Sequence, residues 1–272
     1  MRLLIDHRTR YRFSEPQARL VQLLRMTPAD HNHQTTVAWR IELGCDARLR
    51  HGRDGFGNAI AMLYAEGPID ALEITATGEV LTTDANGVLS GTNEPLPPAL
   101  FLRQTPLTAP DEALVAFAAD TMRSGEPLDR MHRLTAALHQ RFALEHGRPE
   151  PGRTAAEAFA EASVTSRDLT HMLLAAARLG GTPARFVSGY RLASRDRDEQ
   201  PTPHAWVEAC CGDLGWVGFD AAAGACPDDC YVRIAGALDA SGAAPVAGIR
   251  QGQGEEELAA EVTVERLTGT ED

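Results

Sequence analysis

Hydrophobic and polar residues alternate along the first part of the chain. Between residues 2 and 13 nearly every second position is apolar or aromatic, and the positions between them are mostly charged. Residues 37–43 repeat this period of two, and residues 72–82 form another strand-like run. Such alternation predicts β strands with one buried face. Residues 1–83 are therefore predicted to form an antiparallel β domain.

A different period follows a segment of turn-forming residues. Residues 84–110 are rich in Gly, Asn, Thr and Pro and are interpreted as a linker. Apolar residues then recur at helical spacing over residues 111–122, 128–144 and 165–179. After these helices the period of two returns, which predicts strands over residues 183–192, 203–210 and 214–220. Helices followed by strands indicate an α+β core, assigned here to residues 111–235.

The last part of the chain shows a weaker pattern. Residues 221–254 are interpreted as mostly loop. Residues 236–272 are treated as a C-terminal segment, within which residues 258–267 are predicted to return as a strand.

Charge and composition narrow the class of protein. The net charge of -12 argues against nucleic acid or an anionic membrane surface as the main partner. No apolar run approaches the roughly 20 residues that span a bilayer, and Asp6 and His7 stand where a signal peptide needs apolar residues. Five unevenly spaced cysteines suit a reducing compartment. A cytoplasmic protein is therefore expected. Its size and composition do not indicate an oligomeric state.

Two of the predicted strands bring a histidine and a carboxylate together. If residues 211–213 form a three-residue hairpin loop, His204 lies directly opposite Asp220 and Trp206 lies opposite Gly218. Both His204 and Asp220 then point to one face of the sheet. An imidazole beside a carboxylate is the orienting half of a nucleophilic triad, because the acid fixes the tautomer and stabilises the imidazolium.

Ser166 is the candidate nucleophile for such a triad. It stands at the first turn of the predicted helix 165–179, where unpaired backbone N–H groups and the helix dipole favour developing negative charge. A structural role is the alternative, since serine and threonine are favoured helix N-caps. Thr165 and Asp168 also have the spacing of a capping box, with Asp in place of the usual Glu or Gln.

Three ordered motifs resemble the bacterial transglutaminase-like family, which is related in fold and chemistry to papain-like cysteine peptidases. The family pattern is a Gly-x-Cys-x-Asp-x-x-His helix start, then a Thr-His-Ala-Trp-Val-Glu strand and a Gly-Trp-x-x-Phe-Asp-Pro strand. The matching segments here are residues 164–171, 203–208 and 215–221. Residues 184–190 are similar to the strand that follows the nucleophile helix, and residues 1–13 and 54–58 are similar to the β domain that precedes this core.

The resemblance implies a papain-like α+β core of helices packed on an antiparallel sheet, behind an N-terminal β domain. It implies His204 as base and Asp220 as the residue that orients it, with no metal and no organic cofactor. Ser166 occupies the position of the nucleophilic cysteine. Val164, Pro203 and Ala221 also depart from the family pattern. Scattered departures of this kind favour a natural variant over an engineered one.

The expected chemistry is acyl transfer on a peptide or another amide, with hydrolysis favoured over glutamine cross-linking. A serine hydroxyl does not ionise as a thiol of pKa about 8.5 does, so Ser166 must lose its proton to His204 during attack. The alternative is a pseudoenzyme, a binding module that keeps the cleft without the nucleophile. A third possibility is a thiol acting from elsewhere, such as Cys210 or Cys211.

Three other features have structural interpretations. His171 and Asp168 lie three residues apart on one helix face and are interpreted as supporting residues. Residues 226–230, which begin and end with cysteine, lack a second ligand pair for a tetrahedral metal site. His31 and His33 likewise have no evident third ligand, so a polar loop is predicted there.

Overall fold

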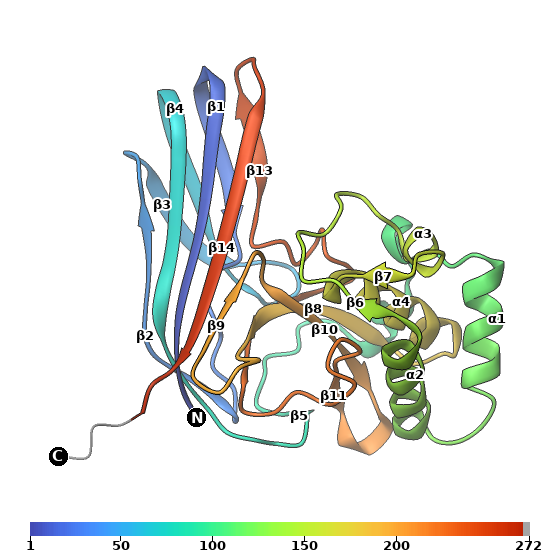
Figure 1. The fold of residues 1–272 in the computed structure, drawn as a ribbon. Coiled ribbons are helices and arrows are strands. Elements are labelled where there is room, and N and C mark those ends of the chain that lie inside the picture. Colours follow the sequence, from blue (N-terminus) through green and yellow to red (C-terminus); the bar gives the residue numbers. More distant parts are fainter. Residues whose placement is uncertain (269–272) are drawn as a thin grey trace.

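The computed structural model describes residues 1–268 and has two parts that lie side by side (Figure 1). One part is a tall antiparallel sheet, and the other is a compact core of helices packed around a smaller sheet. The last four residues of the predicted C-terminal segment 236–272 lie outside the described residues.

The tall sheet has seven strands. Its main path runs β2 (Gln34–Leu43), β4 (Ala59–Thr82), β1 (Arg2–Leu24), β14 (Glu256–Arg266) and β9 (Arg197–Gln200). Two more strands, β3 (Arg48–Arg53) and β13 (Val246–Gln251), pair with β4 and β1. Along β1 every odd-numbered residue from Leu3 to Phe13 is buried, His7 included, so the predicted alternation continues through a histidine.

The sheet does not end where the N-terminal domain was predicted to end. Strands β9, β13 and β14 come from beyond residue 83, and β14 pairs with β1 along eleven consecutive positions. Residues 256–266 thus form the predicted returning strand, and it completes the N-terminal sheet. The sequence pattern could not assign this partner, because pairing between strands so far apart in the chain is a tertiary choice.

The core contains the three predicted helices within a few residues of their expected ends. They are α1 (Glu112–Thr121), α2 (Pro127–Arg141) and α4 (Ser166–Leu179), joined by the short α3 (Ala155–Phe159). Helix α4 is buried from Asp168 to Arg178 and packs on the five-stranded sheet, as well as against the other three helices. Within residues 1–268, no helix has the length and apolar composition to cross a membrane.

The five-stranded sheet has the order β12 (Tyr231–Ala237), β8 (Ala184–Arg191), β10 (His204–Cys210), β11 (Trp216–Phe219) and β5 (Val88–Leu89). A separate small sheet pairs β6 (Ala143–Leu144) with β7 (Ser163–Val164). Strands β8, β10 and β11 confirm the three strands predicted after the helices.

Two segments predicted to be irregular contain some regular structure. The predicted linker 84–110 includes β5 and two 3-10 turns, Pro98–Leu102 and Pro106–Thr108. The prediction of loop over residues 221–254 is wrong, because that segment contains β12 and β13. Strand β12 is buried at six of its seven residues, so it has no polar face to produce alternation in its sequence.

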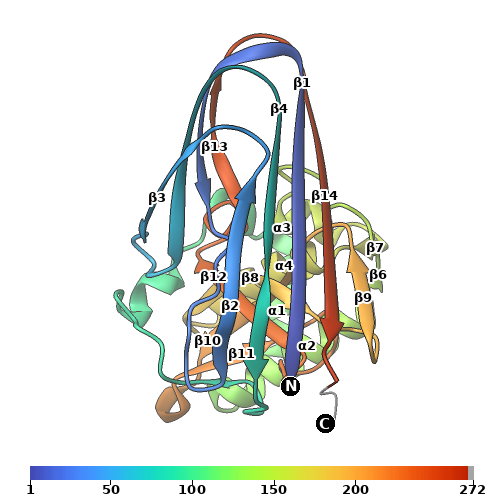
Figure 2. The same cartoon turned by 90° about the vertical axis from the view of Figure 1, so that its left-hand side faces the viewer.

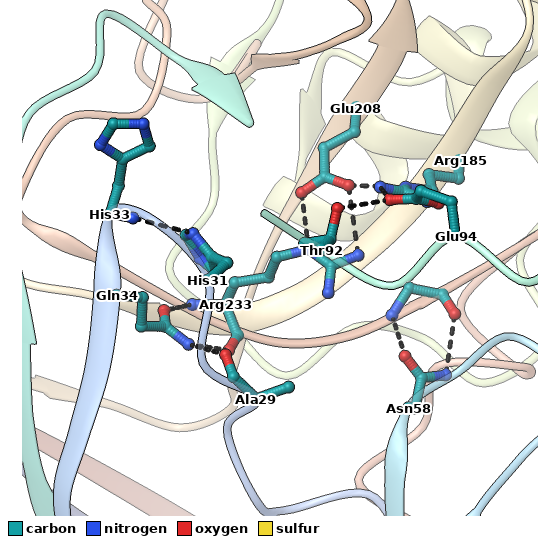
Figure 3. Close-up of polar contacts among 11 residues, drawn as sticks. Ala29, His31, His33, Gln34, Asn58, Thr92, Glu94, Arg185, Glu208 and Arg233 are labelled. Atoms are coloured by element: carbon teal, nitrogen blue, oxygen red, sulfur yellow. Dashed lines mark hydrogen bonds and ion pairs between the residues drawn. The ribbon is translucent and has the colours of Figure 1, made fainter. Parts of the chain in front are cut away.

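Two amide side chains from the first 60 residues of the chain bind the edge of β12 (Figure 3). Gln34 accepts a hydrogen bond from the Arg233 N–H (2.7 Å) and donates one to the Arg233 carbonyl (2.9 Å). Asn58 makes the same pair with Gly236, at 2.8 and 2.9 Å. These amides satisfy backbone groups that a neighbouring strand would otherwise occupy, and they join the two parts of the molecule.

A cluster of buried charges lies next to this junction (Figure 3). The Glu208 carboxylate binds both Arg185 (2.6 Å) and Arg233 (2.7 Å), and Arg185 also binds Glu94 from the 84–110 segment. Burial by itself would raise the pKa of Glu208, but the charges and hydrogen bonds of Arg233 and Arg185 outweigh it and lower the pKa to about 2. Glu208 is therefore ionised wherever the protein is folded near neutral pH.

Candidate active site

The hairpin of β10 and β11 sets the relation between His204 and Asp220. Cys210 pairs with Trp216 and Glu208 pairs with Gly218, so the connection spans residues 211–215. Gly215 takes a φ of 70° there, a left-handed conformation that glycine adopts at little cost. The predicted three-residue loop, with its His204–Asp220 and Trp206–Gly218 pairs, is therefore wrong.

The error in register does not affect the prediction that His204 and Asp220 lie on one face of the sheet. The true register differs by two residues, and side chains alternate with a period of two, so His204 and Asp220 stay on the same side. His204 reaches Asp220 diagonally across the hairpin instead of directly. The distance from His204 Nε2 to Asp220 Oδ2 is 2.7 Å.

The fully buried carboxylate of Asp220 accepts four hydrogen bonds. Oδ2 accepts from His204 and from the Tyr231 hydroxyl at 2.7 Å each, and Oδ1 accepts from the backbone N–H groups of Ala222 (2.8 Å) and Ala223 (3.2 Å). Burial would raise the pKa of Asp220, but the interactions with His204 and the hydrogen bond from Tyr231 outweigh it and lower the pKa. An ionised carboxylate only accepts, so the proton of neutral His204 sits on Nε2 and Nδ1 is left as a base.

Aromatic rings enclose the pair. The Tyr231 ring lies 5.9 Å from the His204 ring and the Trp206 ring lies 6.3 Å from it, measured between centroids. Trp216 lies on the same face of the sheet as His204 but further along the hairpin, where it packs against Phe101 (5.2 Å) and under the Arg185 guanidinium (4.1 Å). His204 is 7% exposed and Asp220 0%, so their hydrogen bond has little competition from water.

Ser166 is the first residue of α4, and it does not cap the helix. The cap is Thr165, whose hydroxyl accepts from the Asp168 N–H while the Asp168 carboxylate accepts from the Thr165 N–H (3.0 Å). The Thr165–Asp168 capping box predicted from the sequence is confirmed, and the capping role considered for Ser166 is wrong. The Ser166 side chain is thereby free for another task, at the helix end where backbone N–H groups are unpaired.

A cleft of about 280 Å³ connects these residues. Ser166 and His204 both line it, together with Leu144, Glu145 and His146. Residues 198–203, the end of β9 and the turn that leads to His204, form another part of its wall. The structure therefore brings two of the three predicted catalytic residues to one cleft and places the third, Asp220, behind His204.

The other candidate residues have structural roles. His171 is buried and its Nε2 accepts from the Ala240 N–H (3.1 Å); burial lowers the pKa of His171 to about 4, so the ring is neutral. Burial raises the pKa of all five cysteines, to about 11 for Cys211 and Cys230. A raised pKa opposes thiolate formation, so none of these thiols has the environment of a reactive cysteine.

Possible metal ligands are few. His31 and His33 contact each other, with the His33 N–H directed at His31 Nδ1 (3.3 Å). In the part of the chain that the structure describes, one group of metal-type ligands comes together, Asp228, Asp229 and Cys230. The Asp229 carboxylate there pairs with the N-terminal ammonium group (3.5 Å) and Asp228 accepts from the Cys230 N–H, so these acids have protein partners.

Comparison with known proteins agrees with this arrangement. Residues 3–81 match the model of the bacterial transglutaminase-like N-terminal region, and residues 115–221 match that of the transglutaminase-like superfamily. The chain carries a transglutaminase-like core. The matched core includes Ser166, His204 and Asp220.

Relatives of this transglutaminase-like chain match it over nearly its whole length. An uncharacterized protein of Mycobacterium leprae is 25% identical over 98% of this chain and 99% of its own. An uncharacterized protein of Mycobacterium tuberculosis is 23% identical over 91% of this chain and 87% of its own. A crystal structure titled "a Putative Cysteine Protease from Cytophaga hutchinsonii" matches with a TM-score of 0.75 at 18% identity, covering 99% of this chain and 92% of that one. This likeness confirms the predicted α+β transglutaminase-like fold.

Sequence reasoning missed two parts of the site. Tyr231, which binds Asp220, lies in the segment interpreted as loop, and nothing in its local pattern marks it. The wall formed by β9 was also missed, since its four polar residues resemble a turn until they pair with β14.

Proposed function

We propose that this protein is a peptide or amide hydrolase that works by acyl transfer, with Ser166 as nucleophile. The observation that carries the proposal is the orientation of His204. Asp220 holds the ring through Nε2, which leaves Nδ1 as the acceptor for a proton, and His204 shares a cleft with a Ser166 side chain that is not needed as a cap.

The chemistry follows from these positions. The Ser166 hydroxyl attacks the carbonyl carbon of the substrate as His204 Nδ1 takes its proton, and the imidazolium is stabilised by the buried Asp220 carboxylate. His204 then returns the proton to the leaving amine. Water repeats the sequence on the ester of Ser166 and releases the acid. Unpaired N–H groups at the start of α4 are suited to the oxyanion.

Hydrolysis is proposed over transfer to a second amine because a protein of similar structure is described as a putative cysteine protease. The proposal requires no metal and no organic cofactor. A peptide or another amide is the proposed partner, in a cytoplasmic location, with neither nucleic acid nor a membrane as partner.

The second candidate function is a binding module without catalysis. One observation favours it: within residues 1–268 the Ser166 hydroxyl makes no hydrogen bond, so it is not held against His204. Hydrogen bonds of a catalytic site commonly tighten only when substrate is bound, which is why this contact alone does not decide between the two functions.

Labelling with a fluorophosphonate separates the two functions. An activated serine should give a single adduct in the intact-protein mass, and the Ser166→Ala variant should give none. A small phosphonate that enters the cleft but leaves a folded wild-type protein unmodified, at any pH between about 6 and 9, would favour the binding module. A matched Ser166→Cys variant should react with iodoacetamide, which verifies that the cleft admits reagents.

A further inference from the structure

Strand β9 is an edge strand whose residues line the candidate active site. It pairs with β14 on one side, and among the described residues no strand pairs with its other side. Figure 2 shows β9 beyond β14 at the border of the tall sheet. Its residues Asp198, Glu199 and Gln200 line the same cleft as Ser166 and His204.

The hydrogen-bond pattern fixes which backbone groups of β9 are available. The Arg266 N–H donates to the Asp196 carbonyl (2.8 Å), so residue 196 directs its backbone groups at β14. In an antiparallel ladder this direction alternates, so residues 198 and 200 also face β14 while Arg197 and Glu199 face away. The N–H and the carbonyl of Glu199 thus point out of the sheet together.

The strand is held in place without using those groups. Gln200 donates to the Arg191 carbonyl (2.7 Å) and to the Asp198 carboxylate (2.8 Å), and Asp198 accepts from the Ala193 N–H (3.3 Å). Both of these side chains are half-buried, while the side chain of Glu199 is exposed. These hydrogen bonds hold the strand in place and leave its outward backbone groups open to a ligand.

We infer that the open edge of β9 binds the substrate as an added antiparallel strand, with one substrate residue exchanging two hydrogen bonds with Glu199. Extended peptides bind exposed sheet edges in this way through main-chain contacts. The inference rests on the proposed function, since that function requires the bound peptide to run from β9 into the cleft. It names the substrate class as an unfolded peptide segment. It also gives the N-terminal sheet a role, since β14 of that sheet holds β9.

The length of the substrate follows from the chain between the two sites. Glu199 precedes His204 by five residues, which span at most about 17 Å. A peptide that pairs with Glu199 therefore needs at most about five extended residues between that contact and its reacting bond. Proteins commonly protect an exposed edge strand from aggregation by keeping it short and charged, and β9 is both short and charged. Unlike an edge strand that only faces solvent, however, β9 lines the cleft.

Two variants of one residue test the edge. Glu199→Pro removes the outward N–H and no hydrogen bond to β14, at an edge position where proline is tolerated. Glu199→Ala removes the same carboxylate and keeps the N–H, so it is the matched control. Each is combined with Ser166→Ala in the full-length chain, and decapeptides enriched from a random library on the immobilised Ser166→Ala protein are the probe.

Affinity is measured by fluorescence anisotropy. Glu199→Pro should lower it about tenfold, because one exposed hydrogen bond is lost and the ring adds some steric hindrance. Glu199→Ala should lower it less than about twofold, because the N–H is kept. Single N-methylation along an enriched peptide should weaken binding at one position in particular. That arm uses the unaltered edge, so it tests the inference even if the proline variant fails to fold.

Equal affinities for the three proteins together with no sensitive N-methyl position would overturn the edge-binding inference, and so would failure to enrich any peptide. None of these readouts requires turnover. Peptides that bind through the edge but are not cleaved by the wild-type protein would keep this inference and remove the proposed hydrolase.

Discussion

Replacing Asp220 with asparagine should invert the tautomer of His204. The two oxygens of Asp220 have different partners, because Oδ1 accepts from the backbone N–H groups of Ala222 and Ala223 while Oδ2 faces His204 and Tyr231. In the Asp220→Asn variant, an amide nitrogen at the Oδ1 position would oppose two N–H donors that cannot move. The carbonyl oxygen of the new side chain must therefore occupy that position, and its NH₂ group must face His204.

The consequence for chemistry is large. With an NH₂ group donating to Nε2, the His204 proton moves to Nδ1, the atom that should accept the Ser166 proton. The same change in a Ser-His-Asp triad lowers kcat by about 10⁴ while it preserves geometry, and we expect roughly 10³- to 10⁴-fold here. Exchanging a charge-assisted hydrogen bond for a neutral one should cost only about 1–2 kcal/mol of folding stability.

Two measurements check this prediction. The rate of fluorophosphonate labelling at Ser166 reports the base, and the ¹⁵N chemical shifts of the His204 ring report the tautomer whether or not the protein is an enzyme. Tyr231→Phe is the control, since it removes one donor to Asp220 without altering the tautomer and should slow labelling about two- to tenfold. An Asp220→Asn protein that still carries its His204 proton on Nε2 would refute the reasoning.

Three further changes have expected outcomes. Glu208→Gln should lower the free energy of unfolding by about 3 kcal/mol near neutral pH, because Arg185 loses a buried partner. The folded pKa of Glu208, about 2, lies below its ordinary value of 4.5. Its stabilisation is therefore complete above pH 4.5 and is lost as the pH falls towards 2, so urea titrations should show a smaller acid-induced loss of stability in Glu208→Gln than in the wild type. Asn58→Ala should cost about 1–3 kcal/mol and speed amide exchange at Gly236, whose N–H it leaves unpaired, and unchanged exchange there would contradict the docking role. Ser166→Cys should introduce a thiol that reacts with iodoacetamide faster than the five native thiols, as judged by peptide mapping, and equal rates would contradict an activating role for His204.

Local patterns were sufficient for much of the fold. Helical spacing placed α4 within a residue of its observed start, and the Thr165–Asp168 pair marked that start correctly. Strands β8 and β10 were also predicted, although both are buried at nearly every residue, because they carry segments that match the family pattern. The same parity placed His204 and Asp220 on one face even though the register was wrong by two, since a face depends only on odd or even position.

The tertiary structure decided what depends on distant partners. Tyr231 reaches Asp220 only because β12 pairs with β8, and β12 has no polar face to show in its sequence. The four residues of β9 become a strand only when β14 returns from the end of the chain to pair with them. The sequence by itself determined the main helices, several strands and the candidate site residues, through local periodicity and motif spacing. The hydrogen bond from Tyr231 to Asp220 and the part of the cleft formed by β9 depend on strand pairing between segments far apart in the chain. Such pairing leaves no local pattern in the sequence.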